Sequence, residues 1–148
     1  MLSKRFNLIN RESIKPFNKV IKVDSDKSLS IRSFLIGAIS QDISKLKNVL
    51  ESEDVFSTIN CLKKLGVKIK LSKDKCEING LGLNGFKYKK NIVLNAGNSG
   101  TLGRLIMGLL VHAKNKIKII GDQSLSKRDF FRVTKPLEKF GAKFKTNS

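Results

Sequence analysis

LKKLGVKIK at residues 62–70 and LEKFGAKFK at residues 137–145 are two copies of one pattern, 75 positions apart. In each copy a stretch with helical spacing stops at a glycine, and alternating apolar and lysine residues follow, as in a half-buried strand. Arg32 and Arg104 recur at a similar separation of 72 positions. Such self-similarity is the signature of a repeated supersecondary unit.

Strands and helices alternate on both sides of these two stretches. We expect strands at residues 20–23, 67–71, 75–78, 92–94 and 117–120, and helices at residues 29–39, 52–65, 101–112 and 128–140. Ser52, followed by Glu53 and Asp54, is a typical helix N-cap with acidic residues in the first turn. The repeated unit is approximately βαβαββ, which predicts an α/β (α+β) fold.

The two copies of the unit differ in completeness. Repeat one covers about residues 20–85 and repeat two about residues 90–148. Repeat two stops after a strand start at residues 142–145, without the closing strands expected within residues 75–83 of repeat one. Residues 1–22 form a leader and the first strand region. We therefore expect the chain to be a fragment, a truncated product or part of a larger enzyme.

The composition favours a binder of small anions. The 148 residues include 30 lysines and arginines against 12 aspartates and glutamates, a net charge of +18. Lysine supplies 24 of these cations, scattered along the chain instead of clustered with aromatic residues, which argues against general nucleic-acid binding. No stretch approaches the roughly 18 apolar residues of a membrane span, and no secretory signal is present, so we expect a cytoplasmic protein without a membrane partner.

The cysteines and the histidine predict neither a metal site nor a disulfide framework. Cys61 and Cys76 lie far apart without a CxxC or Cys/His grouping, and His112 is the single histidine. We expect structural roles for all three residues, and no metal or cofactor is indicated.

Three polar turns hold the candidate functional residues. In DKSLSIR (residues 26–32), Ser28 can cap the following helix, and Lys27 and Arg32 add positive charge beside its N-terminus. NAGNSGT (residues 95–101) follows a buried strand, and its glycines allow successive backbone N–H groups to cradle an anion. GDQSLSKR (residues 121–128) follows the next strand and places Arg128 at or near a helix start.

Each turn also has a plainer explanation. A capped surface helix with solvated cations accounts for the first, a tight turn for the second and a solvated charged pair for the third. Because the three turns occupy equivalent positions of a repeated unit, however, the topology predicts that they lie along one edge and bind anions together.

The same residues carry a resemblance to a known family. DKSLSIR, NSGTLGR (residues 98–104) and GDQSLSKR, in this order, resemble the N-terminal motifs of 5-enolpyruvylshikimate-3-phosphate synthases, and so does the segment from LESEDV (residues 50–55) to LGV (residues 65–67). The resemblance covers about residues 22–144. It implies an inside-out α/β fold in which two globes of βαβαββ units close around the substrates, with residues 23–148 as part of the N-terminal globe.

The resemblance also implies a reaction and its binding residues. The 5-hydroxyl of shikimate 3-phosphate would add to C2 of phosphoenolpyruvate, and the resulting ketal would expel phosphate, a step of the shikimate pathway toward aromatic amino acids. The family's motifs assign shikimate 3-phosphate to Lys27, Ser28 and Arg32, and phosphoenolpyruvate to Lys27, Gly100 and Arg128. Asn98, Thr101 and Arg104 match supporting turn residues. No cofactor is implied, and the full enzyme would be monomeric.

Departures from the family's pattern limit what this chain can do. Asp24 and Ser25 stand where the family usually has Pro-Gly, and Asp129 stands where proline is common. The family's acid and base carboxylates match nothing before Ser148, and Asp54 is better explained as a helix-start acid. We therefore predict no catalytic residue and no turnover for residues 1–148 alone.

Two alternatives stay open from the residues. A related UDP-sugar enolpyruvyl transferase would share the fold, but it typically has asparagine at the position of Ser28 and lacks the arginine that matches Arg32. A non-catalytic basic remnant that binds anions or RNA is the other alternative, since the net charge is +18.

Overall fold

A computed structural model of the chain describes residues 16, 18–21, 23–72 and 75–146. Its elements, in chain order, are α1 (Lys27–Ile39), β1 (Ile43–Lys47), α2 (Glu53–Lys64), β2 (Lys68–Ser72), β3 (Lys75–Asn79), β4 (Ile92–Asn95), α3 (Gly100–Leu109), β5 (Ile117–Ile120), α4 (Gln123–Ser126) and α5 (Phe131–Lys139). Helices and strands therefore alternate as the sequence predicts, and the α/β class is confirmed. Among the described residues, no helix combines the length and the apolar character needed to cross a membrane.

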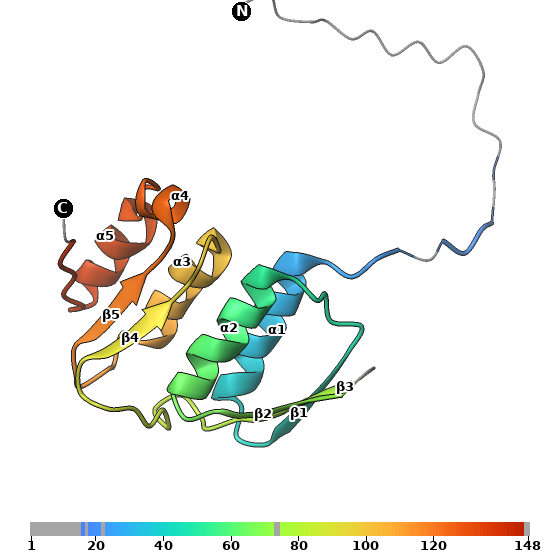
Figure 1. Cartoon of the computed structure of the whole chain (residues 1–148), viewed down its shortest axis with the longest axis horizontal. Helices are drawn as coiled ribbons and strands as arrows, with labels where there is room; N and C mark the ends of the chain where they lie inside the picture. The colour runs from blue at the N-terminus through green and yellow to red at the C-terminus, as the bar shows by residue number, and fades with distance from the viewer. Residues whose placement is uncertain (1–15, 17, 22, 73–74, 147–148) are drawn as a thin grey trace, which may run out of the picture.

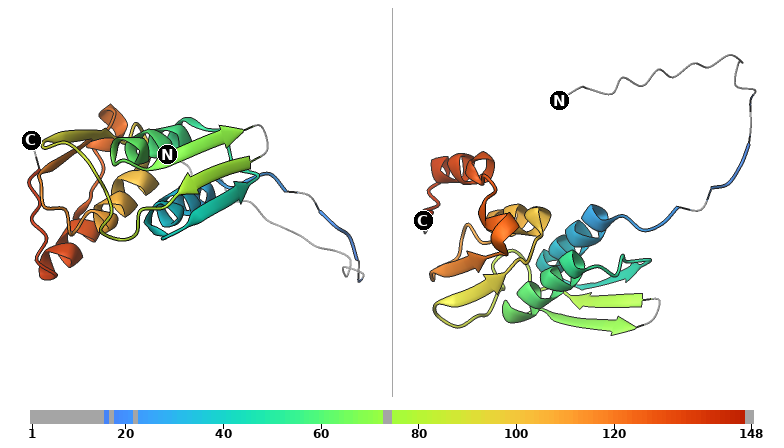
Figure 2. Two further views of the ribbon diagram at one scale, coloured as in Figure 1. Left: turned by 90° about the horizontal axis from the view of Figure 1, so that it is seen from below. Right: turned by 45° about the horizontal axis from the view of Figure 1, so that its top comes forward.

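Two small sheets flank the central helices. β1, β3 and β2 form an antiparallel sheet in that order, with Ile43 opposite Asn79 and Lys68 also opposite Asn79. β4 and β5 pair in parallel, with Ile92 opposite Ile117. Helices α1, α2 and α3 occupy the middle of the structure, between the two sheets (Figures 1 and 2).

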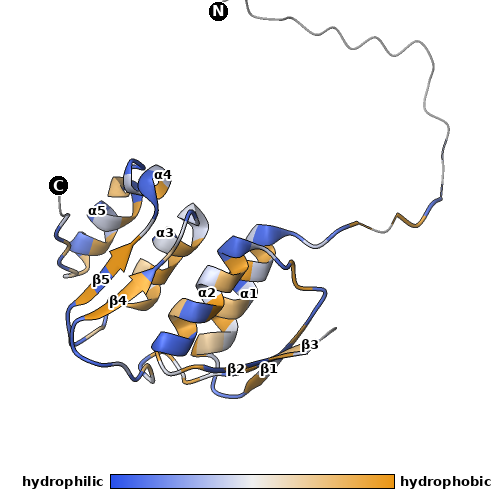
Figure 3. Cartoon of the chain, viewed as in Figure 1, coloured by the Kyte–Doolittle hydropathy of each residue, from blue (hydrophilic) through white to orange (hydrophobic). Residues whose placement is uncertain are grey.

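The central helices supply most of the core. Phe34 and Ile31 of α1, Leu62 of α2, and Leu102 and Ile106 of α3 are buried. They recur at spacings of three and four residues, so each helix turns one apolar stripe toward the others. Figure 3 shows apolar residues along β4 and β5, whereas the starts of α1 and α2 are polar. Burial of these stripes fixes the direction of each helix and leaves its N-terminal end near solvent.

The repeated stretches end their helices with the same geometry. Gly66 and Gly141 both adopt a φ of 91°. The amide after each glycine donates back to the helix: Val67 N to the Leu62 carbonyl at 3.0 Å, and Ala142 N to the Leu137 carbonyl at 3.2 Å. This pattern is the Schellman motif, in which a left-handed glycine satisfies the last carbonyls of a helix. The prediction that a glycine stops both helices is confirmed.

This pair of glycines allows a matched test of local stability. We expect Gly141→Ala to lower the free energy of unfolding by about 1 kcal/mol, since alanine disfavours a left-handed backbone. Gly66→Ala should cost at least about 1 kcal/mol more, because its methyl group would lie 2.9 Å from the Lys87 carbonyl, whereas nothing lies within 4 Å at Gly141. Urea unfolding of both variants measures the difference, and equal losses would contradict this account.

Two predicted strands are absent from the described residues. Residues 20, 21 and 23 are not in a strand, and Val20 is fully exposed; Lys22 lies outside the described residues, as do residues 1–15 and 17 of the predicted leader. Residues 142–145 also have no strand partner. A segment with an apolar or alternating pattern forms a strand only where a neighbouring strand pairs with its backbone N–H and C=O groups. No described segment pairs with either of these two stretches.

Two other boundaries differ from prediction. The helix expected at residues 101–112 ends at Leu109. The helix expected at residues 128–140 is α5, which begins three residues later, at Phe131. The short helix α4 was not predicted, and the turn between α4 and α5 contains Arg128. β1 was not predicted from the sequence. The division of the chain into repeats near residues 85–90 stays a prediction.

Candidate anion-binding site

The starts of α1, α2 and α3 lie at one edge of the structure (Figure 1). Because β4 and β5 are parallel, the turns after them meet, and Asp122 N donates to the Gly97 carbonyl at 2.9 Å. A methyl group on Gly97 would lie 2.9 Å from the Ser57 hydroxyl of α2. Farther along this edge, Lys27 Nζ at the start of α1 lies 2.9 Å from the Asp54 carboxylate of α2. We call this edge, formed by residues 26–32, 95–104 and 121–128, the rim.

The first turn of the rim is capped by Asp26. Its Oδ1 accepts a hydrogen bond from Leu29 N at 2.6 Å. The expectation that Ser28 caps this helix is wrong, because the helix already begins at Lys27 and Ser28 lies inside its first turn. Arg32 Nε donates to the Ser28 carbonyl at 3.2 Å, which folds the guanidinium back toward the helix start. The amides of Lys27 and Ser28 have no acceptor within the helix.

The second turn leads into α3 through a buried serine. Ser99 Oγ accepts a hydrogen bond from Leu102 N at 3.3 Å, so Ser99 is the N-cap. Gly100 and Thr101 are the first two helical residues, and their amides have no acceptor within the helix. These two amides and the positive end of the helix dipole face the rim. The second turn therefore offers backbone donors to an anion.

The third turn places Arg128 between two helices. Asp122 caps α4, with its Oδ1 accepting from Leu125 N at 2.7 Å. Asp129 Oδ1 accepts from Phe131 N at 2.7 Å, and α5 begins at Phe131. Arg128 therefore lies in the turn between α4 and α5, three residues before α5 begins, so it is near a helix start but not at one. Asp129 thus forms the turn at the position where the family commonly has proline.

Two guanidinium groups flank Gly100. A methyl group on Gly100 would lie 2.7 Å from Arg128 Nη1 and 2.9 Å from Arg104 Nη1. Arg128 Nη2 donates to Asn98 Oδ1 at 2.9 Å. The Arg104 guanidinium carbon lies 5.3 Å from the centre of the Phe130 ring, within range of a cation–π contact. The structure thus gathers the predicted residues Asn98, Gly100, Arg104 and Arg128 around the start of α3, in a geometry suited to a carboxylate or phosphate.

The rim shows the internal repeat at the level of hydrogen bonds. Arg32 donates to the carbonyl of Ser28, four residues earlier, and Arg104 Nη1 lies 3.5 Å from the carbonyl of Gly100, also four residues earlier. Both arginines therefore bend over the first turn of their helix, in positions that the 72-residue offset relates. Each repeat presents a helix start with an arginine above it.

Sequence reasoning missed the partners of two carboxylates, Asp122 on the rim and Asp54 of α2 beside it. Asp54 does stand in the first turn of α2, but it also pairs with Lys27, whose side chain is 50% exposed. Hydrogen bonds from Leu125 N and from the Asn98 side chain lower the pKa of Asp122, so this carboxylate is ionised at neutral pH. Asp54 lies in the first turn of a predicted helix, and Asp122 lies in a turn before one. Such positions indicate helix caps, but they do not show which cation or amide the carboxylate contacts.

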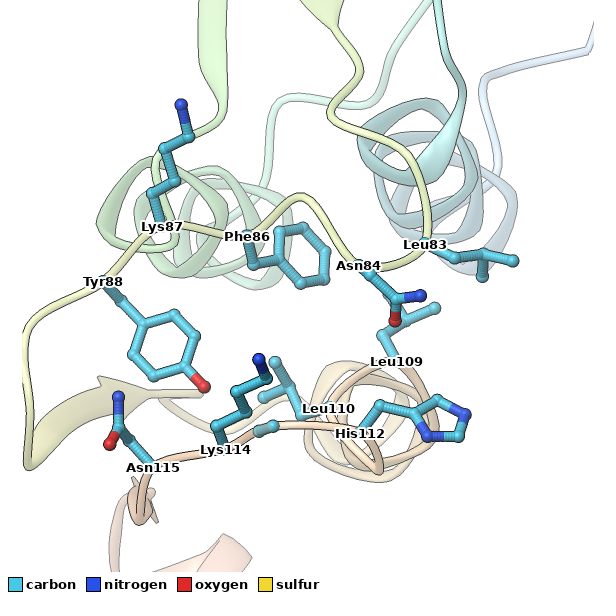
Figure 4. A pocket seen from close by; sticks show the side chains of 11 residues that line it. Leu83, Asn84, Phe86, Lys87, Tyr88, Leu109, Leu110, His112, Lys114 and Asn115 are labelled. Atoms are coloured by element: carbon cyan, nitrogen blue, oxygen red, sulfur yellow. The ribbon is translucent and has the colours of Figure 1, made fainter.

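Two surface hollows lie away from the rim, and neither is lined by its residues. The larger has a volume of about 620 Å³ and is bordered by Lys64 and Val93, among others. The other, of about 470 Å³, lies between residues 83–88 and the end of α3, where Tyr88 and Phe86 face Leu110 (Figure 4). The rim is an open edge and not an enclosed pocket, as expected of one side of a binding site. It would bind an anion through hydrogen-bond donors that point to the same place.

The cysteines and the histidine do not contribute to the rim. Cys61 and Cys76 are buried, and burial raises the pKa of the Cys61 thiol to about 11 and also raises that of Cys76. Both thiols are therefore protonated and unreactive at neutral pH. His112 is exposed in the turn after α3 and borders the smaller hollow. The described residues bring together no cluster of histidine, cysteine and carboxylate side chains suited to a metal ion.

Comparison with known proteins shows which family the sequence matches. The profile of the family described as EPSP synthase (3-phosphoshikimate 1-carboxyvinyltransferase) matches residues 11–148. A 3-phosphoshikimate 1-carboxyvinyltransferase of Ruthia magnifica is 43% identical over 138 residues, which are 91% of this chain and 32% of the relative. That of Bacillus cytotoxicus is 45% identical over 134 residues, 90% of this chain and 31% of the relative.

A solved structure, EPSP synthase from Acinetobacter baumannii, superposes with a TM-score of 0.76 at 37% identity. The superposition covers 86% of this chain and 29% of that one. The chain thus spans about a third of the length of the relatives that it matches, and its α/β architecture is part of their inside-out fold. With the rim's three motifs in the order of that family and a family profile that matches nearly the whole sequence, this chain belongs to the EPSP synthase family.

Proposed function

We propose that this chain supplies the anion-binding rim for transfer of the enolpyruvyl group from phosphoenolpyruvate to the 5-hydroxyl of shikimate 3-phosphate. In that reaction the hydroxyl oxygen bonds to C2 of phosphoenolpyruvate as the hydroxyl loses its proton and C3 gains one. The tetrahedral ketal then loses a proton from C3 as phosphate leaves. Both substrates carry several negative charges. The observation that carries the proposal is the pair of guanidinium groups, of Arg128 and Arg104, beside the free amides at the start of α3.

Shikimate 3-phosphate is assigned to the first turn of the rim. Lys27 and Ser28 are the first two residues of α1, and Arg32 bends back toward them through the Ser28 carbonyl. An ammonium, a hydroxyl and a guanidinium are thus available beside two free amides. Asp54 orients Lys27 without enclosing it, because the lysine side chain stays half exposed. This arrangement supports binding of a phosphate ester at a helix N-terminus.

Phosphoenolpyruvate is assigned to the second and third turns, with Lys27 reaching it from the first. Gly100 lets the substrate approach the backbone closely because it carries no side chain, and Arg128 offers a planar pair of donors that matches a carboxylate. Asn98, Thr101 and Arg104 support this part of the rim. The Arg104 guanidinium is held by the Gly100 carbonyl, the Asp129 carbonyl and the Phe130 ring. We therefore assign Arg104 a role in positioning the substrate and not in proton transfer.

The proposal places the proton-transfer groups elsewhere in the family's fold. The chain spans about a third of its relatives' length. The carboxylates on the rim and beside it already have structural roles: Asp26 and Asp122 cap helices, and Asp54 pairs with Lys27. We further propose a cytoplasmic enzyme that acts as a monomer when the whole fold is present, and that needs no cofactor.

The test is an NMR titration of the 148-residue chain with each substrate. Shikimate 3-phosphate should shift the amide signals of Lys27 and Ser28, and phosphoenolpyruvate those of Gly100 and Thr101, with no 5-enolpyruvylshikimate 3-phosphate formed when both are present. If the chain bound neither substrate but bound RNA, with an affinity that fell steeply as salt was raised, the RNA-binding alternative would replace the proposal. A response to a UDP-sugar instead of shikimate 3-phosphate would favour the other transferase.

A further inference from the structure

The Asn98 side chain bridges Asp122 and Arg128. Its Nδ2 donates to Asp122 Oδ2 at 2.6 Å, and its Oδ1 accepts from Arg128 Nη2 at 2.9 Å. Both bonds connect residues that are distant in sequence, on two different turns of the rim. The three side chains thus form one hydrogen-bonded line that ends at the guanidinium beside Gly100.

The order of donors and acceptors along this line is fixed by chemistry. An ionised aspartate can only accept hydrogen bonds, and an arginine can only donate them. Asn98 therefore has one amide orientation that satisfies both neighbours, with its NH2 group toward Asp122 and its oxygen toward Arg128. If the carboxylate were replaced by a donor, the amide could no longer satisfy both sides.

Asp122 is itself held from two further directions. Its Oδ1 accepts from Leu125 N at 2.7 Å as the N-cap of α4, and its own amide donates to the Gly97 carbonyl at 2.9 Å. The carboxylate is thus fixed to both the second and the third turn. Because its pKa lies below the ordinary value, it keeps its charge at neutral pH and loses it only in more acidic solution.

We propose that Asp122 is a positioning residue for the phosphoenolpyruvate site, acting through Asn98 to hold the Arg128 guanidinium beside Gly100. Only Nη2 of Arg128 is used by Asn98, and Nη1 faces Gly100, where the substrate carboxylate or phosphate would accept from it. This inference rests on the proposed function for the ligand, but the positioning itself is a property of the free chain.

Asp122→Asn tests the proposal while it preserves the helix cap. Asparagine caps helices about as well as aspartate, so α4 should stay folded. Leu125 N and Asn98 Nδ2 donate to different oxygens of Asp122. With its oxygen kept on Leu125 N, asparagine would turn an NH2 group toward the Asn98 NH2 group, a donor against a donor, so the Asn98 bridge is weakened. We expect the dissociation constant for phosphoenolpyruvate to rise roughly 3- to 10-fold, the range of one hydrogen bond, with an unchanged unfolding midpoint.

Two controls separate positioning from net charge. Asp42→Asn removes the same charge from an exposed aspartate after α1, outside the rim, and should leave the dissociation constant unchanged. In an Arg128→Lys background, which lacks the planar fork, the effect of Asp122→Asn should largely vanish, since coupled residues are not additive. Equal effects of Asp122→Asn in both backgrounds would overturn the proposal.

A measurement without ligand keeps this inference distinct from the proposed function. Hydrogen exchange of the Asn98 side-chain amide and of the Arg128 guanidinium should be faster in Asp122→Asn than in the wild type and in Asp42→Asn. If exchange is unchanged, Asp122 does not position Arg128. If exchange accelerates but the wild-type chain does not bind phosphoenolpyruvate, the positioning holds and the proposed function fails.

Discussion

Arg128→Ala is expected to weaken binding of phosphoenolpyruvate to this chain by about 10- to 100-fold, the range of one lost charge-assisted hydrogen bond. The guanidinium is exposed, lies beside Gly100 and is held by Asn98 alone among the described side chains. Its donors therefore remain available to a ligand. Binding of shikimate 3-phosphate, which we assign to the first turn, should change much less, because the two sites use different residues apart from Lys27.

The controls for Arg128→Ala distinguish a local contact from the positive field. Arg132→Ala removes the same charge from an exposed arginine of α5 that is not one of the rim residues. It should change either dissociation constant by less than about twofold at physiological salt, because salt screens exposed charges that do not contact the ligand. Arg128→Lys should recover part of the affinity but not all, since lysine lacks the planar fork. Both dissociation constants come from NMR titration. Equal losses in Arg128→Ala and Arg132→Ala would mean that the net charge, and not the rim, attracts the substrate.

The parts of the fold that could be predicted depend on residues close together in sequence. The ends of α2 and α5 follow from a glycine after an amphipathic stretch, because only the left-handed turn of Gly66 and Gly141 satisfies the last carbonyls. The first two turns could be placed together because helix starts with an arginine recur 72 positions apart, and the second and third because parallel strands such as β4 and β5 share their carboxyl edge.

The parts that could not be predicted depend on contacts between distant residues. Ser28 and Asp26 are both good helix caps, and only the position where α1 begins decides between them. β1 was missed because its inward positions include Ser44, a small polar residue. The helix α1 passes close to it there, and a methyl group on Gly37 would lie 3.2 Å from Ser44 Cβ. This close approach requires a small side chain, which removes the apolar alternation that indicates a strand.

The partners within the rim were hidden for the same reason. The pair of Lys27 and Asp54 joins residues 27 positions apart, and Asn98 lies 24 positions from Asp122 and 30 from Arg128. Local patterns identify each residue as a cap or a cation. Which carboxylate faces which cation follows only from the packing of α1 on α2 and of β4 on β5.

Gly100→Ala should separate binding from folding most clearly. The added methyl group would lie 2.7 Å from Arg128 Nη1 and 2.9 Å from Arg104 Nη1, so both guanidiniums must move. They are the ends of flexible side chains, and their displacement costs little folding energy, while alanine is a better helix residue than glycine by up to about 1 kcal/mol. We therefore expect an unfolding midpoint that is unchanged or raised, and binding of phosphoenolpyruvate that is about tenfold weaker.

Gly108→Ala is the matched control on the same helix. Gly108 has no atom within 4 Å of its added methyl group, so this variant should gain stability from helix propensity alone, by about 0.5 to 1 kcal/mol, and bind phosphoenolpyruvate like the wild type. Urea unfolding and NMR titration give the two quantities for each variant. The two substitutions are chemically identical and lie on the same helix. If only Gly100→Ala weakens binding and neither variant loses stability, the loss of affinity is due to the space beside Gly100. If Gly100→Ala bound phosphoenolpyruvate as tightly as Gly108→Ala does, the substrate would not occupy the space between the two arginines.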